Sequence, residues 1–378
     1  MTKIVNTVFL LLAALGGLTD ARAYTYPPLI PPVDQQTTLT LNLDRSTLGS
    51  THHFLWKKQR NGWGGDGAPY RANNLHCYSA TDPTFGAGNC LGSVVWGSEL
   101  TALALTFTEQ LSQTTHVINL YGYAENIGCG GGKSFALNAY YFASCGGGGQ
   151  YVLTYGKMFT IWIDENEINK LPFGGIWKAH LKLKQRNYAG PSEGYNAYWD
   201  GYIQVNLHDN KNFAIWFPQY RTSVPLLDLA LHTLPTPATP GGKMTGKSTL
   251  DMCLYDGYNG NSNAFEVTLL DGKTIGDRTS EDFSLFRDGV ASSDARKRID
   301  YRIQLDYNGQ PFTLQNNQPL LLTQINQSTL RPVKIPGVAL PVFCAPTPLT
   351  FITPEFNQRD KEAGAYLGYV RVLFTPKL

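Results

Sequence analysis

One glycine-rich segment of this chain could bind phosphate. Residues 241–248 match the nucleotide-binding pattern G-x-x-x-x-G-K-S. Such a loop works only between a buried strand and a helix, because backbone amides and the helix dipole must converge on the anion. Here Pro235, Pro237 and Pro240 precede the segment, and a strand-like segment follows it. We therefore expect no nucleotide site.

Residues 190–194 match the nucleophile pattern G-x-S-x-G around Ser192. That pattern activates a serine only at a strand-to-helix turn of an α/β sheet, and the sequence shows no such alternation. A β-turn explains the segment better. Glu165 and Glu167 could act as paired acids, but an exposed loop beside Asp164 is the simpler interpretation. We expect a protein that is not an enzyme, with a secreted hydrolase as a weaker alternative.

Histidines and cysteines, the usual metal ligands, lack ligand spacing here. His52 and His53 are adjacent, and neighbouring residues of a strand point to opposite faces of a sheet. The six cysteines include no C-x-x-C pair, and no histidine stands at ligand spacing beside them. We expect no metal and no cofactor.

The N-terminus indicates export. A short basic region precedes an apolar run over residues 8–18, and Ala21-Arg22-Ala23 places small residues where a signal peptidase reads them. The apolar run is shorter than the ~20 residues of a membrane-spanning helix. We expect a signal peptide over residues 1–23, a mature chain that begins near Tyr24, and no membrane anchor.

The even number of cysteines in an exported chain indicates disulfides, although six cysteines allow several pairings. Spacing favours two local bridges, Cys77–Cys90 and Cys129–Cys145. That choice leaves Cys253–Cys344 as a long-range bridge in the second half of the chain.

One segment carries a row of basic side chains. In a strand over residues 178–186 these side chains would share one face. They are Lys178, His180, Lys182, Lys184 and Arg186. The row either protects an edge strand from pairing with another chain or binds an anion or glycan, because arginine presents a planar fork of donors. Composition alone does not choose between these interpretations.

The elements that would position these residues are short strands. Apolar residues alternate along the whole chain, for example Leu103, Leu105 and Phe107, and the longest run covers residues 299–307. Only residues 165–171 could form a helical turn. Three dipeptides are typical of hairpin turns: Asp271-Gly272, Asp288-Gly289 and Asn308-Gly309. Many short strands with this spacing predict an all-β protein of sandwich or barrel type.

Composition and length limit the class of protein. A formal net charge of +2 argues against a nucleic-acid binder, and 42% apolar residues suffice for a folded core. The 355 residues that follow a 23-residue signal in a 378-residue chain suit two domains. The boundary lies either near residues 209–212 or in the proline-rich stretch 234–242, which the pattern alone favours.

The end of the chain reads as a final buried strand. Tyr366, Val370, Val372 and Phe374 alternate shortly before the last residue, Leu378. The last sandwich is either complete at this strand or lacks one strand and exposes a groove. A strand from another chain could fill such a groove.

Several segments, spread over nearly the whole mature chain, match one known family. They cover residues 171–177, 205–207, 216–219, 251–258, 341–344, 363–366 and 374–376. In these segments the chain resembles the tip adhesins of class 5 (alternate chaperone–usher) fimbriae, the colonisation-factor and CblD-like pilus initiators. The cysteine spacings are similar to those of this family too.

The resemblance implies two tandem immunoglobulin-like β-sandwich domains. Residues 24–211 would form an adhesin domain, and residues 212–378 a pilin domain that lacks its last strand. The junction then falls near Lys211, in conflict with the pattern-based preference for the proline-rich stretch.

The resemblance also implies partners. A periplasmic chaperone would cover the open groove, an outer-membrane usher would export the protein, and the N-terminal extension of the major pilin would supply the missing strand. A pilus component that accepts a strand and donates none lies at the tip of a cell-surface fimbria. We expect such a tip adhesin, which also initiates pilus assembly. The alternative is a structural initiator with little adhesive role.

In this family an arginine cluster on the adhesin domain is implicated in receptor binding. Arg186 matches one of two adjacent arginines, whereas Asn187 stands where the family has the second. A further family arginine corresponds to Arg71, shortly before Cys77, and Lys184 offers a substitute charge. The resemblance therefore implies a host-cell glycan or glycoprotein as the receptor, bound by Arg71, Arg186 and Lys184.

Overall fold

The computed structural model describes residues 28–377, except 65–68, 80–99, 128–133, 140–155, 188–193, 221 and 236–241. The described chain is almost entirely β, as the alternating pattern predicted. Along strand β4 (Thr101–Glu109), Leu103, Leu105 and Phe107 are fully buried, whereas the residues between them reach the surface. None of the described helices is long and apolar enough to cross a membrane.

The first part of the chain, here called the N-terminal domain, contains strands β1 to β9. They are β1 (Gln35–Asp44), β2 (His52–Trp63), β3 (Asn73–Cys77), β4, β5 (Thr115–Asn126), β6 (Ser134–Phe135), β7 (Gly156–Asp164), β8 (Gly175–Asn187) and β9 (Tyr195–His208). Three short helical turns accompany them: η1 (Arg45–Thr47), η2 (Pro69–Ala72) and α1 (Glu165–Ile168). The strands follow the order β1-β9-β8-β4-β5-β7-β2, with β3 added to β8 and β6 added to β5.

This sheet folds over on itself into a sandwich. Strands β4 and β8 pair only at Thr108 and Glu109, so the sheet turns a corner there. One core unites side chains from both sides of the corner, including Leu181 from β8 and Leu120 from β5. At one edge of the sheet β1 lies parallel to β9 over the whole length of β1.

The C-terminal domain contains strands β10 to β23. They are β10 (Ala214–Trp216), β11 (His232–Thr233), β12 (Lys243–Leu250), β13 (Cys253–Tyr255), β14 (Ala264–Leu270), β15 (Asp282–Arg287), β16 (Arg298–Tyr307), β17 (Gln310–Thr313), β18 (Pro319–Thr323), β19 (Arg331–Val333), β20 (Val342–Pro346), β21 (Leu349–Asn357), β22 (Tyr366–Leu367) and β23 (Arg371–Lys377). The turns η3 (Ala295–Lys297), η4 (Ile325–Gln327) and η5 (Gln358–Asp360) join some of them. The sheets run β10-β13-β20-β19, β11-β12-β21-β16-β15-β22 and β18-β14-β23.

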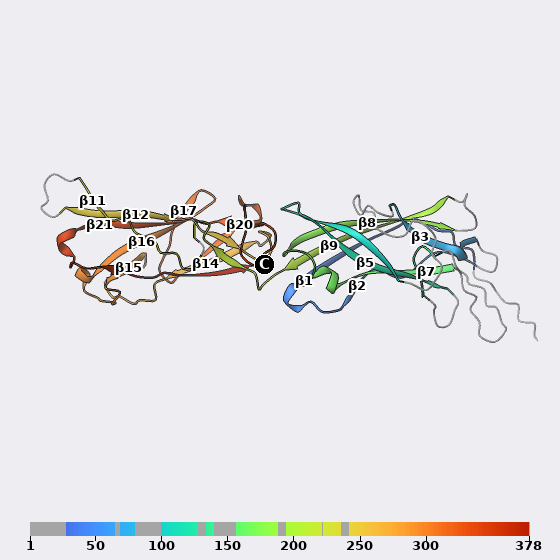
Figure 1. The fold of residues 1–378 in the computed structure, drawn as a ribbon, viewed down its shortest axis with the longest axis horizontal. Coiled ribbons are helices and arrows are strands. Elements are labelled where there is room, and N and C mark those ends of the chain that lie inside the picture. The colour runs from blue at the N-terminus through green and yellow to red at the C-terminus, as the bar shows by residue number, and fades with distance from the viewer. Residues whose placement is uncertain are drawn as a thin grey trace, which may run out of the picture.

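The two domains lie end to end, and the C-terminus of the chain is near the middle of the elongated molecule (Figure 1). At the junction the backbones approach closely. A Cβ atom on Gly174 would lie 2.0 Å from the carbonyl oxygen of Gly257, so this position requires glycine. The amide of Asp209 donates to the same carbonyl oxygen at 3.0 Å.

Glu109 connects the domains at the junction. Its side chain is fully buried at the end of β4, where Oε2 accepts from the Ser112 amide at 2.7 Å. The same oxygen accepts from Asn259 Nδ2 of the C-terminal domain at 2.7 Å, and Oε1 accepts from Asn261 Nδ2 at 3.4 Å. A buried carboxylate needs such donors, and here two of them come from the other domain.

The turn predictions were only partly right. Asn308 and Gly309 have φ values of 52° and 77° and join β16 to β17 as a tight hairpin. Asp271-Gly272 and Asp288-Gly289 instead begin longer connections, from β14 to β15 and from β15 to β16. Such a dipeptide therefore marks a reversal of the chain without fixing where the next strand begins.

The prediction of one final strand was wrong. Residues 366 and 367 form β22 in one sheet, whereas Val372 and Phe374 belong to β23 in another. Gly368 lies between them against β15, where a Cβ atom would come within 2.9 Å of the Ser284 carbonyl oxygen. The chain thus crosses between two sheets at a point that the alternation of apolar residues does not reveal.

Candidate functional site

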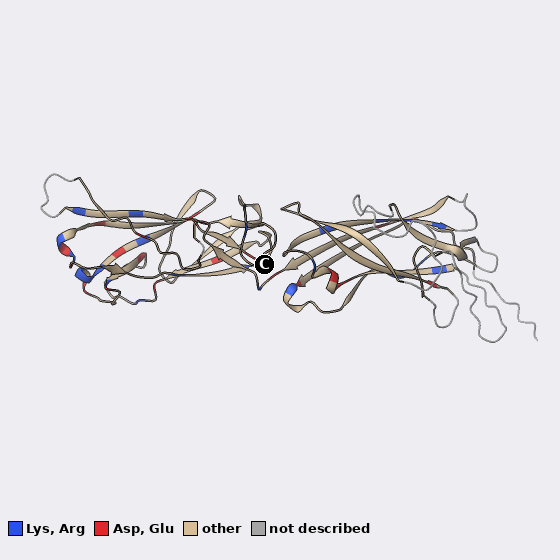
Figure 2. Cartoon of the chain, viewed as in Figure 1, with Lys and Arg blue, Asp and Glu red and all other residues tan. Residues whose placement is uncertain are grey.

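Strand β8 presents the basic row that the sequence predicted. Its alternate residues Leu181 and Leu183 are buried in the core, so Lys182 and Lys184 lie on the outer face. The strand runs away from the junction: Gly175 contacts Glu109, and Asn187 ends the strand twelve residues later, about 40 Å away for an extended chain. The last residues of β8 thus lie at the end of the molecule that is farthest from the C-terminal domain. Figure 2 shows lysine and arginine positions at this far end.

Strand β3 brings two of the predicted receptor residues to the same place. It pairs antiparallel with the end of β8, so that Asn74 lies opposite Arg186. Arg71 is in η2, the turn that leads into β3, and η2 packs against β8. The backbone therefore places Arg71 and Arg186 at one end of one sheet. The side chain of Arg71 lies outside the described part of the structure.

Lys184 lies between two tyrosine rings. Its Nζ is 4.2 Å from the ring centre of Tyr78 and 4.8 Å from that of Tyr195. A cation over an aromatic face is attracted by the ring quadrupole, and the rings hold the lysine stem in place. Sequence analysis missed these tyrosines, because a strand register was needed to bring them together.

A layer of buried polar groups supports this end of the sheet. Gln185 Oε1 accepts from Asn61 Nδ2 at 3.0 Å and from Trp199 Nε1 at 2.9 Å, and Asn73 Nδ2 donates to the Asn61 carbonyl at 3.0 Å. These bonds join β2, β3, β8 and β9. Satisfied buried amides fix a single arrangement of strands, so the outer face above them is held rigidly.

Two further basic groups are buried beneath the same strands. Burial lowers the pKa of His76 to about 4, with smaller contributions from Arg186 and Lys157, so the imidazole is neutral at pH 7. Burial also lowers the pKa of Lys157 to about 7. The Lys157 ammonium donates to the carbonyl oxygen of Ala139 and has no carboxylate partner among the described residues.

The interpretation of Glu165 and Glu167 as an exposed loop was wrong, because both are buried at the start of α1. Glu165 accepts from the Gly49 amide at 2.6 Å, and Glu167 accepts from the Tyr121 hydroxyl at 2.9 Å. Hydrogen bonds lower the pKa of both carboxyls despite the opposing effect of burial, so both are ionised structural acceptors. Their hydrogen-bond partners are distant in sequence, so the local sequence around Glu165 and Glu167 did not indicate that they are buried.

The remaining histidine, serine and cysteine candidates add no reactive centre to the described residues. His52 pairs with Asp164 and His53 with Glu165, so the adjacent rings have different partners. No cluster of three or more metal-ligating side chains occurs among the described residues. Ser192 lies outside them. The segment after the proline-rich stretch is strand β12, which does not provide the helix that a phosphate loop needs.

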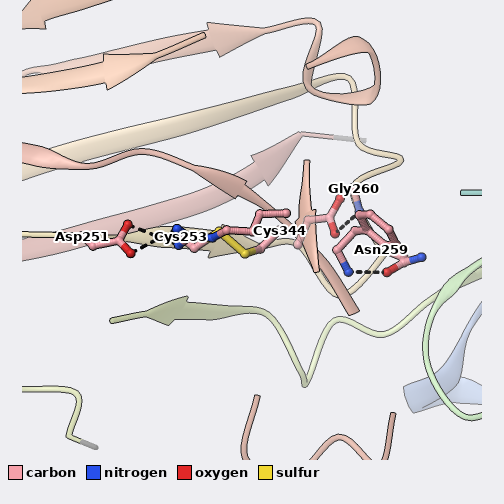
Figure 3. Close-up of a disulfide and its surroundings, with 8 residues drawn as sticks. Asp251, Cys253, Asn259, Gly260 and Cys344 are labelled. Atoms are coloured by element: carbon pink, nitrogen blue, oxygen red, sulfur yellow. Dashed lines mark hydrogen bonds and ion pairs between the residues drawn. A yellow bond between two sulfur atoms is a disulfide. The ribbon is translucent and has the colours of Figure 1, made fainter. Parts of the chain in front are cut away.

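The cysteines are described only in part. Cys253 and Cys344 form the long-range disulfide, with 5.7 Å between their Cα atoms (Figure 3). Cys77 is disulfide-bonded. Cys90, Cys129 and Cys145 lie outside the described residues. Near the Cys253–Cys344 bridge, the side chain of Asn259 accepts from the Phe343 amide at 2.7 Å.

The C-terminal domain has an open strand edge. Strand β23 pairs with β14 on one side, and no other described strand pairs with it. Its residue Phe374 is buried against Phe265, with 4.9 Å between ring centres, whereas Leu373 is 48% exposed. An unpaired edge strand presents free backbone donors and acceptors to another strand.

Comparisons with known proteins agree with this architecture. The family model for the first domain of CfaE, a subunit of CFA/I fimbriae, matches residues 26–210, and that for its second domain matches residues 213–378. The CFA/I fimbrial subunit CfaE of Escherichia coli is 31% identical over 285 residues, which cover 73% of this chain and 72% of that protein.

Solved structures give the same result. The crystal structure of CfaE, the adhesive subunit of CFA/I fimbriae of enterotoxigenic Escherichia coli, matches with a TM-score of 0.75 at 27% identity and covers 92% of this chain and 93% of that one. A chaperone–tip adhesin complex studied in CFA/I fimbria biogenesis matches with a TM-score of 0.68 at 26% identity and covers 92% and 97%. The chain therefore belongs to the CfaE family of CFA/I-type fimbrial subunits, and it is a fimbrial tip adhesin rather than an enzyme.

Proposed function

We propose that the two domains of this tip adhesin have different functions, receptor binding and anchoring to the pilus. Residues 24–211 contact a host-cell glycan or glycoprotein, and residues 212–378 anchor the protein by accepting a donor strand from the major pilin. The observation that carries the first half is the position of Arg186 and Lys184 at the end of β8 farthest from the other domain. At a fimbrial tip, that end would face outward.

The receptor site is assigned to Arg71, Arg186 and Lys184. Arginine donates to carboxylates and to sugar hydroxyls through a planar fork, and it keeps its charge at every physiological pH. Asn187, where the family has a second arginine, is buried opposite Asn73 and carries no charge. We infer that the receptor of this chain differs in detail from those of relatives with the double arginine.

Adhesion is tested with Arg186→Ala and Arg71→Ala in assembled fimbriae, scored by adherence to host cells. We expect both variants to lose adherence while fimbriae form in normal number. Arg302→Ala, which removes a half-exposed arginine on β16 of the C-terminal domain, is the matched control. Unchanged adherence in both variants would favour a structural initiator with little adhesive role.

The second half of the proposal rests on the open edge of β23. A donor strand would pair with this edge and cover apolar side chains such as Leu373. Just before β23, a hollow of about 150 Å³ is lined by Phe286, Leu367 and Tyr369 and by the polar Asp271, Lys273 and Ser284, and it offers space for a side chain of the incoming strand. Before exchange, a periplasmic chaperone would occupy the edge, and the outer-membrane usher would receive the complex. The chaperone–tip adhesin complex of the relative supports the chaperone as a partner.

Strand acceptance is tested by thermal unfolding of the mature chain with and without a peptide of the major pilin's N-terminal extension. A ligand that binds only the folded state must stabilise it, so we expect a large rise in Tm. A peptide with its apolar residues replaced by serine is the control. An unchanged Tm with the native peptide would show that the C-terminal sandwich is complete without a donor.

A further inference from the structure

The outer face of β8 and β9 carries a row of exposed tyrosines next to the candidate receptor site. Their exposed fractions are 44% for Tyr78, 47% for Tyr195, 43% for Tyr198 and 40% for Tyr202. Three of them belong to β9, directly beside the basic row of β8: Tyr198 lies opposite Lys184, and Tyr202 lies opposite His180. Large rings at this exposure in one place are uncommon on a surface that binds nothing.

A β-bulge brings Tyr195 into this row. Tyr198 is three positions after Tyr195, so in a regular strand the two side chains would point to opposite faces. The register of β9 shifts between Gln185 and Arg186 of β8, and Tyr195 lies over Lys184 on the outer face. Bulges re-aim side chains and are frequent beside functional sites.

Three of the four rings have contacts that hold them before any ligand arrives. His180 stacks on Tyr202 with 4.2 Å between ring centres and 15° between ring planes, and Asp200 holds the imidazole at 2.8 Å. The Lys184 ammonium contacts the ring faces of Tyr78 and Tyr195. Fixed rings lose little conformational entropy on binding, which favours affinity.

The chemistry of the row favours a sugar over a protein surface. Between the rings, the outward positions hold Lys182, Asp200 and Gln204, and no aliphatic side chain interrupts them. Protein interfaces have a more apolar centre than this. Pyranose rings offer a flat C–H face for stacking and hydroxyls at their rim, which match rings alternating with hydrogen-bonding groups.

We propose that Tyr78, Tyr195, Tyr198 and Tyr202 form a platform on which successive sugar rings of an extended oligosaccharide stack. The span from Tyr195 to Tyr202 is about 20 Å along β9, enough for several rings in a row. The oligosaccharide would run along strands β8 and β9, with one of its ends at Arg186. This inference rests on the proposed adhesive function and specifies its ligand as an oligosaccharide longer than a terminal sugar.

The test is a printed glycan array that carries the same sugars as monosaccharides and as oligosaccharides of increasing length, probed with the mature chain. We expect binding to strengthen with length. Tyr198→Ala and Tyr202→Ala should each weaken oligosaccharide binding about fivefold, while Tyr198→Phe, which keeps the ring, should bind nearly as wild type. Phe312→Ala, an exposed aromatic on β17 of the C-terminal domain, is the matched control.

The outcomes separate this inference from the function on which it rests. If Arg186→Ala abolishes glycan binding while both tyrosine-to-alanine variants bind as wild type, the platform is wrong and the adhesive site stands. If wild type binds monosaccharides and oligosaccharides equally, the platform is again overturned. If wild type binds no printed glycan and its adherence to cells resists periodate oxidation of cell-surface sugars, the platform fails together with the glycan receptor itself.

Discussion

Four cations, two in each domain, have different kinds of partner. In the C-terminal domain, Arg278 pairs with Asp271 at 2.5 Å, and Arg298 pairs with Asp277 at 2.7 Å and with Asp300 at 3.0 Å. In the N-terminal domain, Lys157 meets a carbonyl oxygen and Lys184 meets two tyrosine rings. Paired ions stabilise one structure, whereas an accessible cation without a carboxylate partner stays attractive to an anion or a polar ligand. Lys184 is partly exposed, whereas Lys157 is fully buried. The difference assigns a structural role to the two arginines and to buried Lys157, and a role in recognition to Lys184.

The largest effect is expected from breaking a pair in the C-terminal domain. Asp271→Ala would leave Arg278, whose side chain is only 7% exposed, without its partner. An uncompensated buried charge costs about 3–5 kcal/mol, so the free energy of unfolding should fall by that amount in chemical denaturation. Asp277→Ala is the control, because Asp277 is 58% exposed and Arg298 keeps Asp300. If both variants lose the same free energy of unfolding, the buried Asp271–Arg278 pair contributes no more to stability than the exposed Asp277.

An intermediate effect concerns Lys157. Its pKa is about 7 in the folded chain and 10.5 when unfolded, so folding releases a proton and stability is lost as pH falls from 10.5 towards 7. Between pH 7 and 9 the free energy of unfolding should rise by up to about 1.4 kcal/mol per pH unit. Tryptophan fluorescence measures the unfolding of the N-terminal domain, which contains Lys157, because six of the seven tryptophans lie before residue 211. Lys157→Met should make the free energy of unfolding nearly independent of pH between pH 7 and 9. If the pH dependence persists in this variant, another titrating group causes it.

The smallest effect on stability is expected at Lys184. Lys184→Gln removes a cation from two exposed rings, which is worth less than about 1 kcal/mol, so Tm should barely change. Adherence of the same variant should nevertheless fall. Lys178→Gln, at the junction end of the same strand, controls for loss of charge alone. A large drop in Tm would give Lys184 the structural role of the C-terminal arginines.

Sequence predicted the class of fold well because burial alternates with residue position. Leu103, Leu105 and Phe107 could be assigned to the core from their spacing alone. The burial of Glu165 and the crossing of the chain between sheets at Gly368 could not be predicted from spacing, because both depend on contacts with distant parts of the chain. Short-range pattern carries strand and turn information, whereas the position of a strand within its sheets is a long-range property.

The residues of the candidate site also fall into those that the sequence predicted and those that only the strand register revealed. Lys184 and Arg186 were visible as members of a basic row, and family resemblance pointed to Arg71. The tyrosines were not visible, although Tyr198 and Tyr202 stand four positions apart in what the structure shows to be strand β9. Their meaning depends on the register of β9 against β8 and on one bulge. No single-strand pattern contains that information.

The parallel pairing of β1 with β9 also sets the timing of folding. Asn42 bonds with Asn206, 164 residues later in the chain, so the first strand is synthesised long before its partner. Contacts of such long sequence separation form slowly, and a waiting strand is open to wrong partners. For the N-terminal domain, the time that its first strand spends unpaired therefore matters in addition to the stability of the finished sandwich.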